Sequence, residues 1–113
     1  MDVDTAETLA GVVRLLRQGA VLAWAAADRA GAGSPGQLLA MGVDLAADQA
    51  RHLVLDGTDV DGPVPVGDEP AGLLRSAELL LRRVSPVAGS EALDDLQATV
   101  ADLVWEANTG VGA

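Results

Sequence analysis

An imidazole is the side chain whose ordinary pKa lies closest to neutral pH, and the chain has a single one, His52. On a helical wheel His52 falls beside Met41 and Leu45, at the edge of an apolar face, and Gln49 falls near the centre of that face. A buried amide must find hydrogen-bond partners. One interpretation is a small ligand pocket formed by His52, Gln49, Met41 and Trp24. The alternative is a core glutamine and a boundary histidine that bond to the backbone.

A second group of polar side chains lies in an acidic segment between two predicted helices. Asp59-Val60-Asp61-Gly62 is followed by Asp68, and carboxylate oxygens are ligands for hard cations. This spacing resembles the calcium loop of the EF-hand family. The segment departs from that loop at the first ligand, where Gly57 stands, and at the last, where Asp68 is shorter than the usual bidentate Glu. We assign no metal ligand, and leave open a cation site or a solvated loop of turn residues.

The composition excludes several classes of chemistry. The chain has no Cys and no Lys, which excludes a disulfide framework, a thiolate metal site, a P-loop lysine and a Schiff-base lysine. A net charge of −10 opposes binding to a phosphate backbone, so we expect no nucleic-acid partner. The chain also lacks a Gly-x-Ser-x-Gly elbow. We therefore expect no cofactor, and a non-enzymatic role is favoured over a catalytic one.

The apolar residues predict helices. They are almost entirely Leu, Val and Ala, without Ile, Phe or Tyr, and this set favours helices over strands. Lys, Ile, Phe and Tyr, whose codons are AT-rich, are absent and Asn occurs once, which indicates a GC-rich bacterial genome. Apolar residues recur at helical spacing between Pro- and Gly-bearing breaks. The sequence predicts an all-α, four-helix bundle of two antiparallel helical hairpins, as a single domain over 1–113, with helices at about 5–30, 35–55, 69–84 and 91–108.

Capping residues support these boundaries. Ser34, Pro35 and Gln37 form a predicted capping box with proline at the first helical position. Asp68 and Ser90 are the expected N-caps of the last two helices.

The first helix carries an unusually wide apolar face. Leu15, Leu22 and Ala26 extend it to roughly 200°, about twice the usual minimum for a core stripe. This helix must therefore touch two neighbours, or one neighbour and a second subunit.

Two large apolar residues lie away from the predicted core faces. Trp105 falls off the stripe of the last helix, near Ala98 and Ala101, and Leu79 falls on the polar side of the third. Tryptophan is enriched among the residues that dominate protein interfaces. These four residues form the predicted partner-binding surface, unless a loop or the C-terminal tail covers Trp105.

The function expected from these patterns is a small acidic helical interaction or accessory module that self-associates or docks onto a partner protein. A homo-oligomer, with a dimer favoured, is the expected assembly. A ligand-binding bundle with a pocket near His52 is the alternative, and an acidic inhibitor that binds a basic surface through the last helix is a third. Because the N-terminus is acidic and the apolar run Gly19–Ala27 is too short to span a bilayer, we expect a cytoplasmic protein without a membrane partner.

Overall fold

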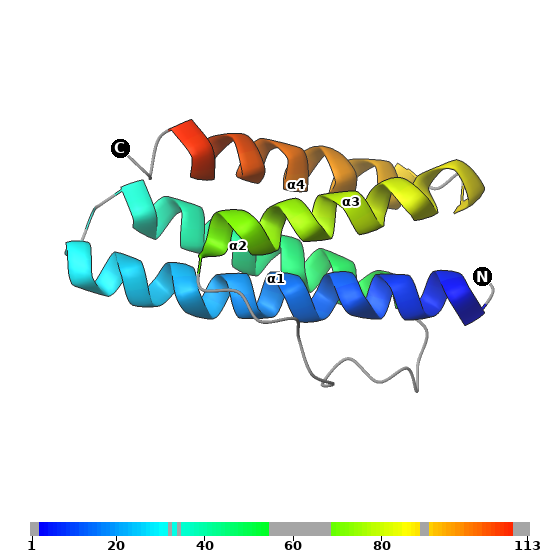
Figure 1. Cartoon of the computed structure of the whole chain (residues 1–113), viewed down its shortest axis with the longest axis horizontal. Helices are drawn as coiled ribbons and strands as arrows, with labels where there is room; N and C mark the ends of the chain where they lie inside the picture. Colours follow the sequence, from blue (N-terminus) through cyan, green and yellow to red (C-terminus); the bar gives the residue numbers. More distant parts are fainter. Residues whose placement is uncertain (1–2, 32, 34, 55–68, 89–90, 110–113) are drawn as a thin grey trace.

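Four α-helices make up the computed structural model of this chain, which describes residues 3–31, 33, 35–54, 69–88 and 91–109. They are α1 (Val3–Ala30), α2 (Pro35–Leu53), α3 (Pro70–Ala88) and α4 (Glu91–Thr109) (Figure 1). The prediction of an all-α four-helix bundle is confirmed.

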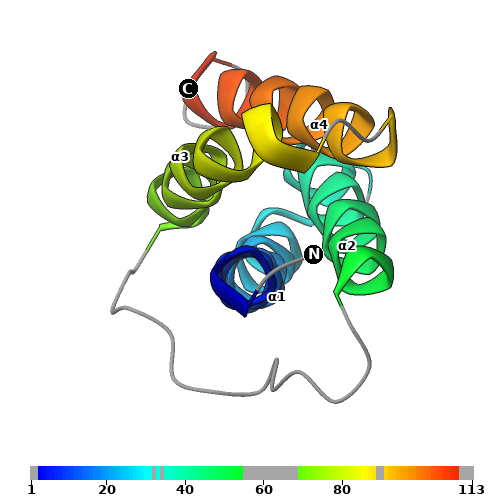
Figure 2. The ribbon, with the colours of Figure 1, turned by 90° about the vertical axis from the view of Figure 1, so that its right-hand side faces the viewer.

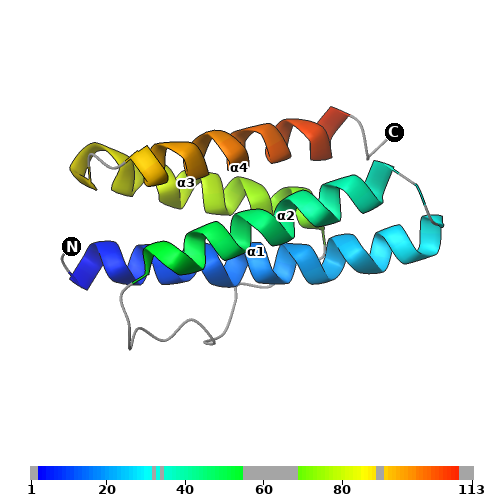
Figure 3. The same cartoon turned by 180° about the vertical axis from the view of Figure 1, so that it is seen from behind.

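The helices occupy the corners of a square. α1 packs against α2 and α3, and α4 packs against the same two helices (Figure 2). α2 and α3 therefore lie across a diagonal from each other, and so do α1 and α4. The packed neighbours run in opposite directions in Figure 1, and Figure 3 shows α2 lying between α1 and α4.

The predicted helix bounds are close to the observed ones, except at the end of the third helix. The sequence predicted a break at Ser85-Pro86, but α3 continues to Ala88. Pro86 lacks the N–H that would bond one turn back, and α3 ends two residues after it.

The turn between α1 and α2 depends on glycine. Gly31 has φ 101° and Gly33 has φ 78°, in the left-handed region that other residues rarely adopt. The Gly31 N–H donates to the carbonyl of Ala27 at 3.0 Å, which closes the C-terminus of α1. At the start of α2, Oε1 of Gln37 accepts from the Gly33 N–H at 2.8 Å, whereas a capping box would have the N–H of Ser34, one residue later, as the donor. Ser34, Asp68 and Ser90 lie outside the described residues.

Aliphatic side chains fill the interior. Leu and Val from all four helices are fully buried there: Leu9, Val12, Val13, Leu16, Val43, Leu74, Leu81, Leu96 and Val100. The wide apolar face of α1 is accounted for within the bundle, because Leu15 is buried and the helix packs on both α2 and α3. The structure therefore shows the first alternative, in which α1 touches two neighbouring helices of the same chain. The wide apolar face of α1 does not require a second subunit.

By length and composition alone, α1 could cross a membrane. The shorter apolar run Gly19–Ala27 within it could not. Half of the relevant segment is buried inside the bundle. Core helices and signal sequences share these properties, so the finding does not assign a location.

Candidate functional site

α2 has two apolar faces, and the structure decides which one is inside. The inner face is mostly alanine: Ala40, Ala46, Ala47 and Ala50 lie there together with Val43 and one leucine, Leu39. The apolar residues of the outer face are all large. Leu38, Met41 and Leu45 are 68%, 49% and 64% exposed, and their spacing of three and four residues places them on one side of the helix. We call these three residues the α2 stripe.

Small residues lie inside because α2 approaches its neighbours closely. A Cβ atom on Gly42 would stand 2.7 Å from Cδ2 of Leu103 on α4, so the two helices meet at this glycine. Larger side chains on the inner face would force the helices apart. The bulkier apolar residues of α2 therefore remain on the outside, where they form a surface typical of interaction sites.

Acidic side chains border the α2 stripe at its C-terminal end and along the edge next to α4. Asp48 is exposed and continues the stripe by three residues after Leu45. On α4, the exposed Glu106 follows Leu103 by three residues, and Leu103 faces α2. Asp95, also exposed, lines a surface depression between α2 and α4. α2 and α4 together contain seven acids and one Arg or Lys, namely Arg51.

The outer side of α3 has the opposite charge. Leu79 is 53% exposed, and Arg75, Arg82 and Arg83 are exposed beside it at helical spacing. Arg82 forms an ion pair of 3.6 Å with Glu78, one turn earlier on the same helix. We call Leu79, Arg75, Arg82 and Arg83 the α3 basic face.

The predicted partner-binding residues are all on the surface. Trp105 is 68% exposed, and Ala98 and Ala101 are exposed on the same side of α4. Leu79 lies on the neighbouring helix α3. Their exposure agrees with the expectation from sequence, and their role in binding stays a prediction.

The predicted ligand-binding residues lie in different parts of the surface. Gln49, expected at the centre of an apolar face, is exposed, because that face of α2 points outward. Gln49 and His52 line a depression of about 260 Å³ with Asp48, Leu53, Ala92 and Asp95. Trp24 lines a different depression, between the end of α1 and the start of α2. Met41 belongs to the α2 stripe.

The histidine is held by its own helix. Nδ1 of His52 lies 2.7 Å from the carbonyl oxygen of Asp48 and 3.8 Å from its carboxylate. Because a carbonyl oxygen only accepts, Nδ1 must be the nitrogen that donates. This agrees with the alternative interpretation, in which the histidine bonds to the backbone, although the imidazole is exposed rather than at a boundary.

The indole of Trp24 ties α1 to α2. It is half-buried against the core, and its Nε1–H donates to Oδ2 of Asp44 at 2.6 Å. Both partners of this bond are thus occupied by an interhelical contact, which gives Trp24 a structural role.

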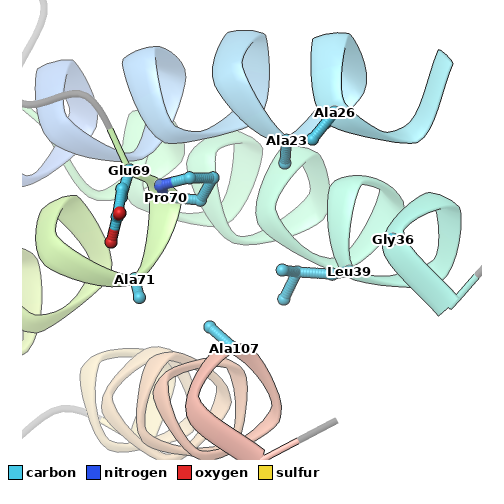
Figure 4. Close-up of a pocket in the computed structure, with 8 residues that line it drawn as sticks. All are labelled: Ala23, Ala26, Gly36, Leu39, Glu69, Pro70, Ala71 and Ala107. Carbon is cyan, nitrogen blue, oxygen red and sulfur yellow. The ribbon is translucent and has the colours of Figure 1, made fainter. Parts of the chain in front are cut away.

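A cavity of about 310 Å³ opens at the end of the bundle where α1 ends and α2 and α3 begin. Its lining is mostly small: Ala23, Ala26, Gly36, Leu39, Glu69, Pro70, Ala71 and Ala107 (Figure 4). Short side chains from four helices leave this space unfilled, and Glu69 is the charged residue in the lining.

The sequence led us to assign no metal ligand, and it left open whether the acidic segment with Asp59, Asp61 and Asp68 binds a cation. Among the residues that the structure describes, no cluster of three or more His, Asp or Glu side chains is placed to hold a metal ion. Asp59, Asp61 and Asp68 lie outside those residues, so the question of a cation at this loop stays as the sequence left it.

The sequence interpretation missed Leu38 and Leu45 and gave Met41 a different role. Their spacing, continued by Asp48 and His52, was visible in the sequence as a second face of the helix. Hydrophobicity ranks Leu and Met above Ala as core residues. The arrangement here is the reverse, because close helix packing selects for small volume.

Comparisons of this chain with protein-family models, with curated proteins and with solved structures found no match.

Proposed function

We propose that this chain is a small helical interaction module that self-associates or docks onto a partner protein. The observation that carries the proposal is the α2 stripe, in which three large apolar side chains share one exposed side of a helix. Contiguous exposed apolar surface with a polar border is characteristic of protein interaction sites. The surface around Trp105 is a second contact region of the same kind.

The stripe is suited to docking rather than to chemistry. Its side chains offer apolar area without a nucleophile or an acid–base group, and the acidic residues beside it are exposed. Burying a large aliphatic side chain contributes about 1.5–3 kcal/mol, so three of them can hold a complex of moderate affinity.

The test compares Leu38→Gln/Leu45→Gln with Val21→Gln. Glutamine matches leucine in helix propensity, and Val21 is an equally exposed apolar residue (62%) on α1. The oligomeric mass is measured by light scattering, and protein partners are identified by cross-linking in cells of the source organism. We expect the stripe variant to keep its helicity and to lose the principal complex, whether with itself or with another protein, by about tenfold or more. We expect Val21→Gln to retain that complex.

Two results would contradict the proposal. One is a wild-type chain that forms neither a homo-oligomer nor a reproducible complex. The other is a complex that the stripe variant and Val21→Gln retain equally.

A ligand-binding bundle is the second candidate. The end cavity favours it more than the depression at His52, because four helices surround the cavity. A bound apolar molecule would shift the methyl resonances of Ala23 and Ala107, which line the cavity, and methyl NMR detects this during a ligand titration. Changes in the NMR signals confined to the His52 imidazole would instead favour the pocket near His52 that the sequence predicted.

A further inference from the structure

The bundle carries two surfaces that match each other in charge and in polarity. The α2 stripe, bordered by Asp48, Asp95 and Glu106, is apolar and acidic. The α3 basic face presents Leu79 and three arginines. An arginine buries its aliphatic stem on apolar surface while its guanidinium reaches a carboxylate, so each surface offers what the other lacks.

We propose that a second copy of this chain occupies the α2 stripe, and that it docks through its α3 basic face. This inference rests on the proposed function, of which it specifies the partner and the geometry. Leu79 of one copy lies against Leu38, Met41 and Leu45 of the other, and the flanking arginines meet the acidic border.

Charge decides between this contact and a symmetric one. Two α2 stripes packed face to face in antiparallel orientation would bring the acidic α4 edge of one copy, with Asp95 and Glu106, against the acidic edge of the other. Like charges facing each other across an interface oppose binding. The net charge of −10 also repels a second copy at long range, but physiological salt screens it beyond about 8 Å, so the groups in contact dominate.

The position of the two surfaces determines the kind of assembly. α2 and α3 are diagonal neighbours in the bundle, so their outer sides point in opposite directions (Figure 2). Each docked copy therefore leaves one α3 basic face and one α2 stripe exposed at the two ends of the dimer. A head-to-tail contact of this kind grows into a chain or closes into a ring, according to the rotation between copies.

In the first experiment, each of two variants disrupts one of the two surfaces, and the variants are then mixed. Leu38→Gln/Leu45→Gln removes the stripe, and Arg75→Glu/Arg83→Glu reverses the charge of the basic face. All four positions are exposed, so we expect both variants to fold, which circular dichroism verifies. Arg17→Glu/Arg29→Glu is the matched control, because it makes the same change of net charge at exposed positions of α1.

We expect the mass of the wild type and of the control to increase with concentration beyond that of a dimer. Each single-surface variant stays at about 11.4 kDa. An equimolar mixture of the two variants associates again and stops at a 1:1 dimer, because one intact stripe and one intact basic face remain between them. A symmetric interface cannot be restored by mixing.

The second experiment uses the absence of cysteine in the chain. Leu79→Cys and Leu45→Cys each introduce a single thiol, and a short bifunctional maleimide joins thiols that lie close together. When the two variants are mixed, we expect the main product to join the thiol of a Leu79→Cys copy to the thiol of a Leu45→Cys copy. A symmetric stripe contact would instead join two Leu45→Cys copies.

Three results would overturn the inference: a wild type that stays monomeric at about millimolar concentration, variants whose mixture fails to associate while the wild type does, or cross-links mainly between identical thiols. A monomeric wild type with a heterologous complex that depends on the stripe would overturn only the self-association. Failure of both self-association and heterologous complex formation would overturn the proposed function as well.

Discussion

At the scale of single residues, the contact between Trp24 and Asp44 links the first two helices. The indole N–H donates to a carboxylate oxygen at 2.6 Å, a short and charge-assisted hydrogen bond. Asp44 is exposed, so water competes for the same groups and reduces the net contribution of the bond to stability.

We expect Asp44→Ala to lower the free energy of unfolding by about 1 kcal/mol relative to Asp48→Ala. Both changes replace an exposed aspartate of α2 with alanine, so their effects on helix propensity cancel in the comparison. Urea unfolding measures the difference, and the indole N–H of Trp24 should exchange faster with solvent in Asp44→Ala. Equal stability of the two variants, with unchanged exchange, would show that the bond contributes nothing.

At the scale of elements, the contact between α2 and α4 depends on one missing side chain. Gly42 lies in the middle of α2, where alanine would ordinarily favour the helix. Leu103 explains why this position is glycine. The buried Leu103 side chain lies too close, at 2.7 Å, to the place that a Cβ atom would take. Glycine here allows close packing at the expense of helix propensity.

We expect Gly42→Ala to destabilise the bundle by about 1 kcal/mol, because Leu103 must move within a packed interior. Gly72→Ala is the control: Gly72 is an exposed glycine of α3 whose added Cβ would meet nothing within 4 Å. That change should stabilise the protein by about 0.5–1 kcal/mol through helix propensity. Thermal and urea unfolding give both values, and a Gly42→Ala variant as stable as Gly72→Ala would refute the close contact.

At the scale of the whole molecule, the bundle separates apolar residues that stabilise the fold from those that are available for binding. Leu81 and Leu79 lie two residues apart on α3, and their environments are opposite. Leu81 is fully buried, while Leu79 belongs to the α3 basic face.

We expect Leu81→Ala to lower the free energy of unfolding by about 2–5 kcal/mol, because it leaves a cavity in the core. Leu79→Ala should change that free energy by about 0.5 kcal/mol or less. The measurement is urea unfolding at low protein concentration, so that self-association does not contribute. A large loss for Leu79→Ala under these conditions would mean that Leu79 stabilises the single bundle.

Much of the fold could be predicted from the sequence. Helical periodicity, the break at Gly31–Gly36 and the preference of Leu and Ala for helices are local properties, so they determine four helices without knowledge of the packing. The predicted end of α3 at residue 84 was too early, because α3 continues through Pro86 to Ala88.

The sequence by itself determined the four helices, the aliphatic core of α1, α3 and α4, and the position of Trp105 and Leu79 away from the core faces. Only the tertiary structure decided which face of α2 is inside, that α1 has two neighbours within one chain, and that α2 and α3 lie diagonally across the bundle from each other. The reason is physical: periodicity fixes which residues share a face, whereas the distance between packed helices selects the face. At Gly42 that distance admits small residues, and Leu38, Met41 and Leu45 remain outside.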